Sequence, residues 1–251
     1  MRGPLSYVGG KNRLAHLIID KIPQHTTYVE PFAGGAQVFF QKPPSKVEVL
    51  NDLDGELVNF YRVCQHHYTV LLEYLRFVLR SREVYDRLQK TPPDTLTDIL
   101  RAARYFYLQK TSFGGRVTRQ SMARHVSKPP GFTSANIPQM IEDTHERLTR
   151  VQIENLPYEK VIEKYDTPET FFYIDPPYFN IQCYRYNLGE EDFRRMADLL
   201  GTIKGKFILS LNDVPEVRTI FSRFRVEAVE LSYSIQKHAG RRYAELLISN
   251  F

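Results

Sequence analysis

The segment Thr170–Tyr178 reads TFFYIDPPY. It starts as a short apolar run of β-branched and aromatic residues, a composition typical of a buried strand. Two consecutive prolines then end the strand, because proline cannot donate to a sheet ladder and fixes the direction of the backbone. Asp175 and Tyr178 therefore lie on a stiff turn at the carboxyl end of a strand, the edge where open α/β sheets bind ligands. A plain strand-ending turn is the alternative, and the rest of the chain must decide between the two.

The composition is that of an ordinary folded protein. The chain has 251 residues, of which 42% are hydrophobic and 25% charged, enough for one α/β domain, alone or with an insertion. No apolar run approaches the roughly 18–20 residues of a membrane span, and the N-terminus lacks the apolar part of a signal peptide, so we expect a cytoplasmic protein. The two cysteines, Cys64 and Cys183, stand in no CxxC motif and at no histidine spacing, which argues against a disulfide framework or a zinc site.

The positive charge is concentrated in one middle segment. Residues 76–128 contain twelve Lys or Arg and four Asp or Glu, a local charge of +8. Because the whole chain carries +5, the remainder carries −3. A basic segment of this kind is expected of a surface that faces phosphates, although a solvated basic helix face is also possible.

Near the N-terminus, Ser6–Lys11 reads SYVGGK. The double glycine lets the backbone approach a ligand closely, and the apolar residues that follow recur at helical spacing, which places Lys11 near a helix start. A lysine there can neutralise an anionic ligand group beside the exposed backbone donors of the first turn. A structural turn is the commoner explanation of such a motif on its own.

The segment Thr27–Ala36 reads TYVEPFAGGA and predicts a strand, a glycine turn and a helix, the first half of a nucleotide-binding unit. The loop matches neither GxGxxG nor GxxxxGK[ST], so neither a dinucleotide nor a nucleoside triphosphate is the natural ligand. Glu30, Pro31 and Phe32 supply an acid, a rigid corner and an apolar face in place of a phosphate cradle. This combination suits a ligand that contains adenosine but no phosphate chain.

A second strand, Val47–Asn51, is followed by the acid Asp52. Asp52 comes 18 residues after Gly34, close to the ~20-residue offset at which an acid binds ribose hydroxyls. A carboxylate accepts from both the 2′- and 3′-hydroxyls, which argues for a ribose without a 2′-phosphate. The alternative is that Asp52 only caps the helix that follows it.

From about residue 60 to 148 the apolar residues repeat at helical periods and no βαβ strand is evident, which predicts a helical insertion into the α/β domain. Within it, Thr111–Arg119 reads TSFGGRVTR, a glycine-centred turn or hairpin that presents Phe113 between basic residues. An exposed ring flanked by arginines suits wedging or stacking against bases, with phosphate contacts beside it. The alternative is that Phe113 belongs to the core.

The remainder of the chain returns to an α/β pattern. We expect strands at 151–155, 207–212, 225–231 and 243–249, the last two forming a terminal pair, and helices at 158–165, 193–200 and 217–221.

These motifs, in this order, resemble the DNA adenine-N6 methyltransferases of the α group, the Dam-like family with a DPPY tetrapeptide. The matching pieces are GGK, VEPFAGG, LND after a strand, a helical insertion, FFYIDPPY and a closing ELLISNF, and together they span Ser6 to Phe251. The resemblance implies an α/β, Rossmann-like S-adenosylmethionine-dependent methyltransferase fold, with a mixed sheet and a terminal antiparallel hairpin. It also implies that 1–59 and 149–251 form the catalytic domain of a prokaryotic or phage-type enzyme, and that 60–148 is the helical target-recognition insertion.

The resemblance further implies roles for individual residues. The residues that match the cofactor site for S-adenosylmethionine are Tyr7, Lys11, Glu30, Pro31, Phe32, Gly34, Asp52 and Asp175. Those that match the catalytic tetrapeptide are Asp175, Pro176 and Tyr178. The insertion residues expected to contact double-stranded DNA are Lys110, Phe113, Arg116, Thr118, Arg119 and Arg124.

The implied chemistry is methyl transfer from S-adenosylmethionine to the N6 amine of adenine. This amine is a poor nucleophile because its lone pair is delocalised into the ring. Its two N–H groups would donate to the carboxylate of Asp175 and the carbonyl of Pro176, so that transfer needs little beyond alignment and charge complementarity. Tyr178 would stack on an adenine flipped out of the duplex. No metal is required, and we expect a monomer or weak dimer.

Two positions depart from the family pattern. Gly114 stands where the GATC-methylating relatives have Asn in an aromatic-Asn-Gly turn, and Thr118 stands where they place a base-reading arginine, so the recognition sequence stays open. Residues 155–158 lack the acid found there in relatives, which leaves open how the adenine ring of the cofactor is held. Three alternatives to the adenine reaction also stay open: a cytosine-N4 methyltransferase, a non-catalytic DNA-binding relative, and RNA as the substrate.

Overall fold

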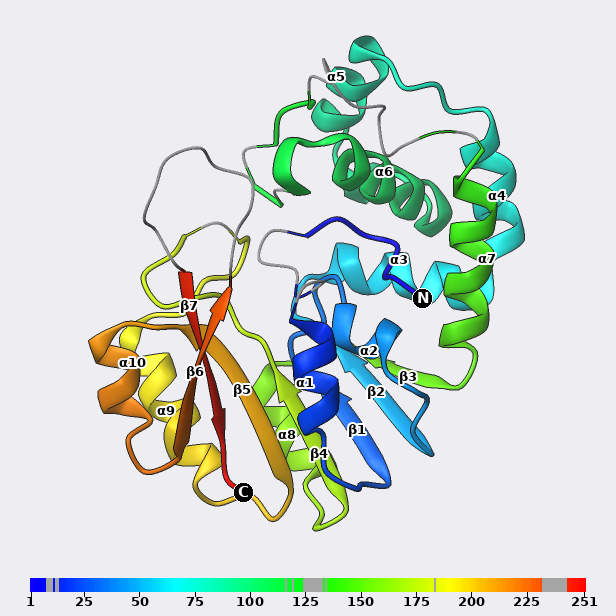
Figure 1. The fold of residues 1–251 in the computed structure, drawn as a ribbon. Coiled ribbons are helices and arrows are strands. Elements are labelled where there is room, and N and C mark those ends of the chain that lie inside the picture. The colour runs from blue at the N-terminus through cyan, green and yellow to red at the C-terminus, as the bar shows by residue number, and fades with distance from the viewer. Residues whose placement is uncertain are drawn as a thin grey trace.

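The sheet at the centre of the fold has the strand order β3-β2-β1-β4-β5-β7-β6 (Figure 1). The structure is a computed structural model and describes residues 1–7, 11, 14–115, 117–118, 120–123, 133, 135–182, 184–231 and 243–251. Neighbouring strands from β3 to β5 are parallel, whereas β7 is antiparallel to both β5 and β6. The strands are β1 (Thr27–Glu30), β2 (Val47–Asn51), β3 (Val151–Glu154), β4 (Thr170–Ile174), β5 (Lys206–Asn212), β6 (Arg225–Leu231) and β7 (Tyr243–Ser249). The expected mixed sheet with a terminal antiparallel pair is confirmed.

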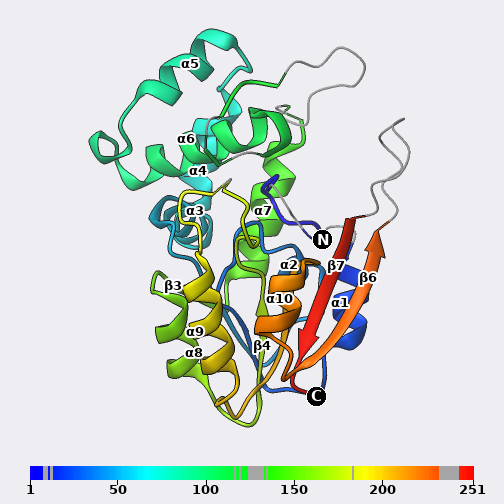
Figure 2. The same cartoon turned by 90° about the vertical axis from the view of Figure 1, so that its left-hand side faces the viewer.

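Helices cover both faces of the sheet, which explains why β4 is apolar along its whole length. Successive side chains of a strand point to opposite faces, so Phe171 and Tyr173 enter one hydrophobic cluster and Phe172 and Ile174 enter the other. The first cluster contains residues of α1 (Ala15–Lys21), α2 (Gln37–Gln41) and α3 (Gly55–His66), and the second those of α8 (Tyr158–Tyr165), α9 (Glu190–Leu200) and α10 (Pro215–Ile220) (Figure 2).

The insertion is helical and lies beyond one end of the sheet (Figures 1 and 2). The N-terminal boundary of the insertion, expected near residue 60, falls within α3. This helix continues past residue 60, and its aromatic side chains pack against the insertion. The rings of Phe60 and Phe106 stack with centroids 5.5 Å apart. The insertion elements are α4 (Tyr68–Arg76), α5 (Arg82–Lys90), η1 (Pro93–Thr95), α6 (Asp98–Thr111), η2 (Phe113–Gly115) and α7 (Ile137–Leu148).

A buried ion cluster attaches the last insertion helix to the sheet. Glu48 on β2 accepts from Lys42 at 2.6 Å and from Arg147 on α7 at 2.5 Å. Arg147 also donates to the carbonyl of Phe39 at 3.0 Å, and its guanidinium lies 3.7 Å from the centroid of that ring. Burial alone raises the pKa of Glu48, but the bonds from Arg147 and Lys42 outweigh it and the pKa is lowered. The carboxylate therefore stays charged between two cations.

Removing this carboxylate should destabilise the protein strongly. Glu48→Ala leaves the buried ammonium of Lys42 without its acid, and breaking a buried pair from one side costs about 3–5 kcal/mol. Thermal unfolding followed by circular dichroism would measure the loss as a lower midpoint. The matched control is Glu163→Ala, which breaks a pair with Lys160 on the surface of α8 and should change the midpoint little. Equal midpoints for the two variants would contradict the role of the cluster.

Candidate cofactor and active site

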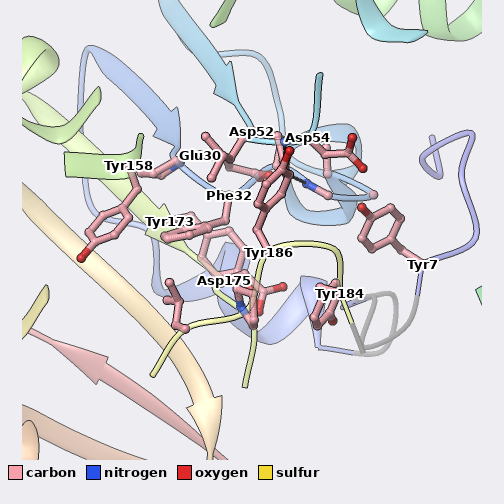
Figure 3. Close-up of a pocket in the computed structure, with 18 of the residues that line it drawn as sticks. Tyr7, Glu30, Phe32, Asp52, Asp54, Tyr158, Tyr173, Asp175, Tyr184 and Tyr186 are labelled. Carbon is pink, nitrogen blue, oxygen red and sulfur yellow. Dashed lines mark hydrogen bonds between the residues drawn. The ribbon is translucent and has the colours of Figure 1, made fainter. Parts of the chain in front are cut away.

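A cavity of about 320 Å³ opens at the carboxyl ends of β1, β2 and β4 (Figure 3). Parallel strands present these ends at one edge of the sheet, so acids that follow different strands meet there. All the cofactor residues predicted from sequence line this cavity: Tyr7, Lys11, Glu30, Pro31, Phe32, Gly34, Asp52 and Asp175. Of the predicted catalytic residues, Asp175 lines it, whereas Pro176 and Tyr178 are not among its lining residues; Pro177 is.

Asp52 is fixed by the glycine loop and by the start of α3. Its Oδ2 accepts from the backbone N–H of Gly34 at 2.9 Å, and its Oδ1 accepts from the N–H of Asp54 at 2.9 Å. Gly34 has φ +46°, a left-handed conformation that favours glycine. The side chain that caps α3 is Asp54, which accepts from the N–H of Glu56. Burial raises the pKa of Asp52 to about 6.

Glu30 is held from its buried side. Its Oε1 accepts from the hydroxyl of Tyr28 at 2.6 Å and from the N–H of Phe39, near the start of α2, at 2.9 Å. Burial raises the pKa of Glu30 to about 8, although both hydrogen bonds oppose the shift. A cationic ligand group beside Glu30 would therefore favour its ionised form.

Asp175 directly follows β4 and is fixed through one oxygen. Oδ1 lies 2.8 Å from the ammonium of Lys11 and accepts from the hydroxyl of Ser210 at 3.1 Å. No residue that the structure describes donates a hydrogen bond to Oδ2, and Asp175 lines the cavity. The carboxylate is therefore anchored at one oxygen and has the other available as an acceptor.

Lys11 and Tyr178 form a buried cluster with an acid that the sequence did not indicate. The ammonium of Lys11 lies 2.9 Å from Oε1 of Glu245 on β7 and donates to the hydroxyl of Tyr178 at 2.6 Å. That hydroxyl in turn donates to Glu245 at 2.8 Å. Lys11 was expected to neutralise an anionic ligand group, but here it neutralises carboxylates of the protein itself. Its ammonium is nearer to the hydroxyl than to the ring centroid, at 4.6 Å, so it lies at the edge of the ring.

The loop after β4 closes one side of the cavity, and sequence reasoning missed its contribution. Arg185 pairs with Asp54 at 2.9 Å, and the ring of Tyr184 stacks on that of Tyr7 at 6.2 Å. Tyr186 and Leu188 also line the cavity (Figure 3). This loop has neither helical nor strand periodicity, so no pattern in the sequence marked it as part of a site.

Part of the cavity wall is apolar. The rings of Phe32 and Tyr158 contact one another with centroids 5.1 Å apart, and Leu156 and Pro157 extend this wall. Asn155, where relatives have an acid nearby, donates its side-chain amide to the carbonyl of Asp52 at 2.7 Å. A flat ring can pack by apolar contact against this wall.

The predicted DNA-contacting residues lie near the glycine turn of the insertion. The ring of Phe113 is 61% exposed, which excludes the core alternative. Lys110 is half-buried at the end of α6, and burial lowers the pKa of its ammonium. Thr118 is partly exposed. The remaining predicted contacts, Arg116, Arg119 and Arg124, lie outside the described residues.

Glycine is required at the second position of this turn. Gly114 and Gly115 have φ +66° and +65°. A Cβ on Gly114 would meet no atom within 4 Å, so the Asn of relatives, which tolerates this conformation, is exchanged here for Gly without a steric consequence. A Cβ on Gly115 would lie 2.6 Å from the carbonyl oxygen of Ser6. The turn therefore packs directly on the segment that carries Tyr7.

Within the described part of the chain, none of the helices combines the length and the apolar character of a membrane span. The same residues include no group of three or more His, Cys, Asp or Glu side chains that could hold a metal ion.

Comparison with known sequences gives a family. Residues 7–235 match the D12 class N6 adenine-specific DNA methyltransferases. The chain is 26% identical to Type II methyltransferase M.CviBI of Paramecium bursaria Chlorella virus NC1A, over 96% of this chain and 94% of the relative. It is 27% identical to Type II methyltransferase M1.LlaDCHI of Lactococcus lactis subsp. cremoris, over 98% and 94%. It is 24% identical to a DNA adenine methylase of Vibrio cholerae serotype O1, over 100% and 96%.

The fold and the family match together define an S-adenosylmethionine-dependent methyltransferase. Within that class, the chain belongs to the D12 class N6 adenine-specific DNA methyltransferases. The expected family, fold and adenine-specific activity on DNA are thus confirmed. The cavity fits the cofactor, because S-adenosylmethionine carries a sulfonium and an ammonium, and the lining supplies the acids Glu30, Asp52 and Asp175 and no phosphate cradle.

The affinity for S-adenosylmethionine should depend on pH through Asp52. A carboxylate with a pKa of about 6 accepts from ribose hydroxyls only when ionised, so binding should weaken as pH falls from about 7 to about 5. Asp52→Asn should bind about 10–100-fold more weakly near pH 7 and lose the part of this dependence that comes from Asp52. Glu30, with a pKa of about 8, would have to lose its proton beside a cationic group of the cofactor, so it weakens binding in the same direction as pH falls and accounts for the dependence that the variant retains.

Isothermal titration calorimetry at several pH values would measure these affinities. The control is Asp20→Asn, which changes an exposed acid on α1 and should leave the wild-type curve intact. If Asp52→Asn kept the wild-type pH dependence, the assignment of Asp52 to the ribose would be wrong.

Proposed function

We propose that this protein transfers a methyl group from S-adenosylmethionine to N6 of an adenine flipped out of double-stranded DNA, with Asp175, Pro176 and Tyr178 holding the base. The observation that carries the proposal is the state of Asp175. One of its oxygens is anchored by Lys11 and Ser210, and the other is an available acceptor on a turn that two prolines stiffen.

The chemistry needs an acceptor of this kind. When bound, S-adenosylmethionine supplies a methyl group activated by a sulfonium. The carboxylate of Asp175 and the carbonyl of Pro176 accept the two N–H bonds of the adenine amine, which raises the electron density on nitrogen. Because both acceptors are fixed before the base arrives, little reorganisation is needed during transfer.

The cofactor site is assigned from the shape and charge of the cavity. Asp52 accepts from the ribose hydroxyls, and Glu30 meets the ammonium of the methionine part. The apolar wall formed by Phe32, Leu156, Pro157 and Tyr158 packs against the adenine ring, which supplies an answer to the missing acid near residue 155. Tyr7 and Lys11 form the wall contributed by the N-terminal segment. We further propose a monomer or weak dimer, and none of the proposed steps uses a metal.

The insertion is assigned to DNA binding. Its charge of +8 over residues 76–128 suits the phosphate backbone, and the exposed ring of Phe113 suits a wedge into the base stack that an extruded adenine leaves. The turn packs on the N-terminal segment at Gly115, so a ring held there lies close to the cofactor cavity. Val117, directly beyond the turn, lines that cavity.

Methyl transfer should require Asp175. We expect the wild-type protein to incorporate tritium from labelled S-adenosylmethionine into duplex DNA, and digestion should yield N6-methyladenine rather than N4-methylcytosine. Asp175→Ala should reduce the rate by at least about 10³-fold while duplex binding stays within about twofold, because the variant loses an acceptor to the reacting amine. Asp213→Ala, an acid at the same end of the neighbouring β5, should retain activity. Normal transfer by Asp175→Ala would refute the mechanism.

Duplex binding should require the turn of the insertion. Phe113→Ala should weaken binding about tenfold, since base–aromatic stacking contributes about 1–3 kcal/mol. Replacing Arg116 and Arg119 together with alanine should weaken it further and lower the slope of log K against log salt by about 2. Fluorescence anisotropy at several salt concentrations would measure both. The control replaces Arg194 and Arg195 on the exposed face of α9 with alanine, and equal losses there would contradict a specific role for the turn.

A further inference from the structure

A second carboxylate lies directly behind the catalytic turn. Glu245 on β7 is 6% exposed and does not line the cavity. Its Oε1 accepts two donors, the ammonium of Lys11 at 2.9 Å and the hydroxyl of Tyr178 at 2.8 Å. Both donors are connected to the catalytic turn. Lys11 forms an ion pair with Asp175, and Tyr178 is the last residue of the DPPY tetrapeptide. Glu245 thus contacts one of the three residues assigned to the base, Tyr178, directly and a second, Asp175, through Lys11.

The neighbouring strand holds the same turn from its other end. Asn212 on β5 is the register partner of Glu245. Its side chain accepts from the N–H of Phe179 at 3.0 Å and donates to the carbonyl of Phe179 at 3.3 Å. The backbone after Tyr178 is therefore fixed by β5, whereas the side chains of Tyr178 and Asp175 are fixed through β7 and Lys11.

The position of Lys11 depends on a balance between two acids. Its ammonium is 4% exposed and lies within 3 Å of both Asp175 and Glu245. Burial alone would lower the pKa of Lys11, but the charges of the two acids outweigh it and raise the pKa well above its usual value. If Glu245 were absent, the whole of this charge would act on Asp175. The charge of Lys11 would then draw electron density from the carboxylate of Asp175, which must accept a hydrogen bond from the substrate amine.

We propose that Glu245 is a positioning residue for methyl transfer, which divides the ammonium of Lys11 between two acids and fixes the rotation of the Tyr178 ring. This inference rests on the proposed function, because it assigns a consequence for the rate to the residues that hold the base. Glu245 does not line the cavity, and we assign it no contact with substrate or cofactor. Its effect must therefore appear in the transfer step and not in the affinity for either ligand.

The test compares two substitutions of Glu245. Glu245→Ala removes the acceptor and should lower the single-turnover rate of methyl transfer from preformed protein–cofactor–DNA complex about tenfold or more. The dissociation constants for S-adenosylmethionine and for duplex DNA should stay within about twofold. Glu245→Gln keeps an amide oxygen for Lys11 and Tyr178 but not the negative charge, so its rate should fall between those of the alanine variant and wild type.

The matched control is Glu227→Ala on β6. Glu227 also lies in the antiparallel pair and also bonds a lysine, Lys21, at 2.9 Å, but that pair is exposed. The Glu227→Ala variant should transfer methyl groups at the wild-type rate. Thermal midpoints of all variants would separate a change in rate from a loss of folded protein, and Glu245→Gln keeps the test decisive if the alanine variant unfolds.

The outcomes separate this inference from the proposed function. If wild-type protein methylates no adenine, the proposed function fails. If wild type is active and a folded Glu245→Ala transfers at the wild-type rate, only the role of Glu245 is overturned. The role of Glu245 is also overturned if the transfer rate and the cofactor affinity of Glu245→Ala fall together. It is overturned as well if a folded Glu245→Gln transfers methyl groups as slowly as Glu245→Ala.

Discussion

The buried ammonium of Lys11 joins three segments that are far apart in the sequence. It bonds to Asp175 after β4 and to Glu245 on β7, and it lies itself just before α1. This positive charge offsets the repulsion between the two carboxylates and holds Oδ1 of Asp175 in place, which leaves Oδ2 available. The proposed catalytic use of the DPPY turn therefore depends on a residue from the N-terminal segment.

The contact between the insertion and the N-terminal segment has a similar consequence. Gln109 on α6 donates at 2.7 Å to the carbonyl of Ser6 and also to that of Gly115. The same two carbonyls thus share one side-chain amide at the place where Gly115 has no room for a side chain. Tyr7, which follows Ser6, lines the cofactor cavity. Gln109 and the close approach of Gly115 to Ser6 therefore join the turn to the segment that lines the cavity.

The sequence predicted most of the fold because its strands are strongly patterned. The segment TFFYI is apolar on both faces, as expected of a strand covered on both sides. The motifs VEPFAGG and DPPY contain prolines that cannot donate to a sheet ladder, so the ends of these strands could be predicted from the sequence. The acids that follow these strands could be placed at one edge because parallel strands share it. Glu245 and Arg185 could not be found in this way. Glu245 belongs to an antiparallel strand that brings it to the edge from the opposite direction, and Arg185 lies in a loop without periodicity. The boundary expected near residue 60 falls inside a continuous helix, α3, which carries no breaker that the sequence could have marked.

The uneven charge of the chain follows from its two kinds of ligand. Outside residues 76–128 the sequence carries −3, and acids line the cavity at the ends of β1, β2 and β4. A cationic cofactor is stabilised by such a cavity, whereas the phosphates of DNA are repelled by it. In the proposed assignment, the basic segment attracts the duplex at a different surface. Only an uncharged base needs to enter the acidic part of the molecule, and extruding a single nucleotide delivers such a base while its phosphates stay outside. The separation of charge along the chain is thus a physical reason for a methyltransferase of this family to take its adenine out of the helix.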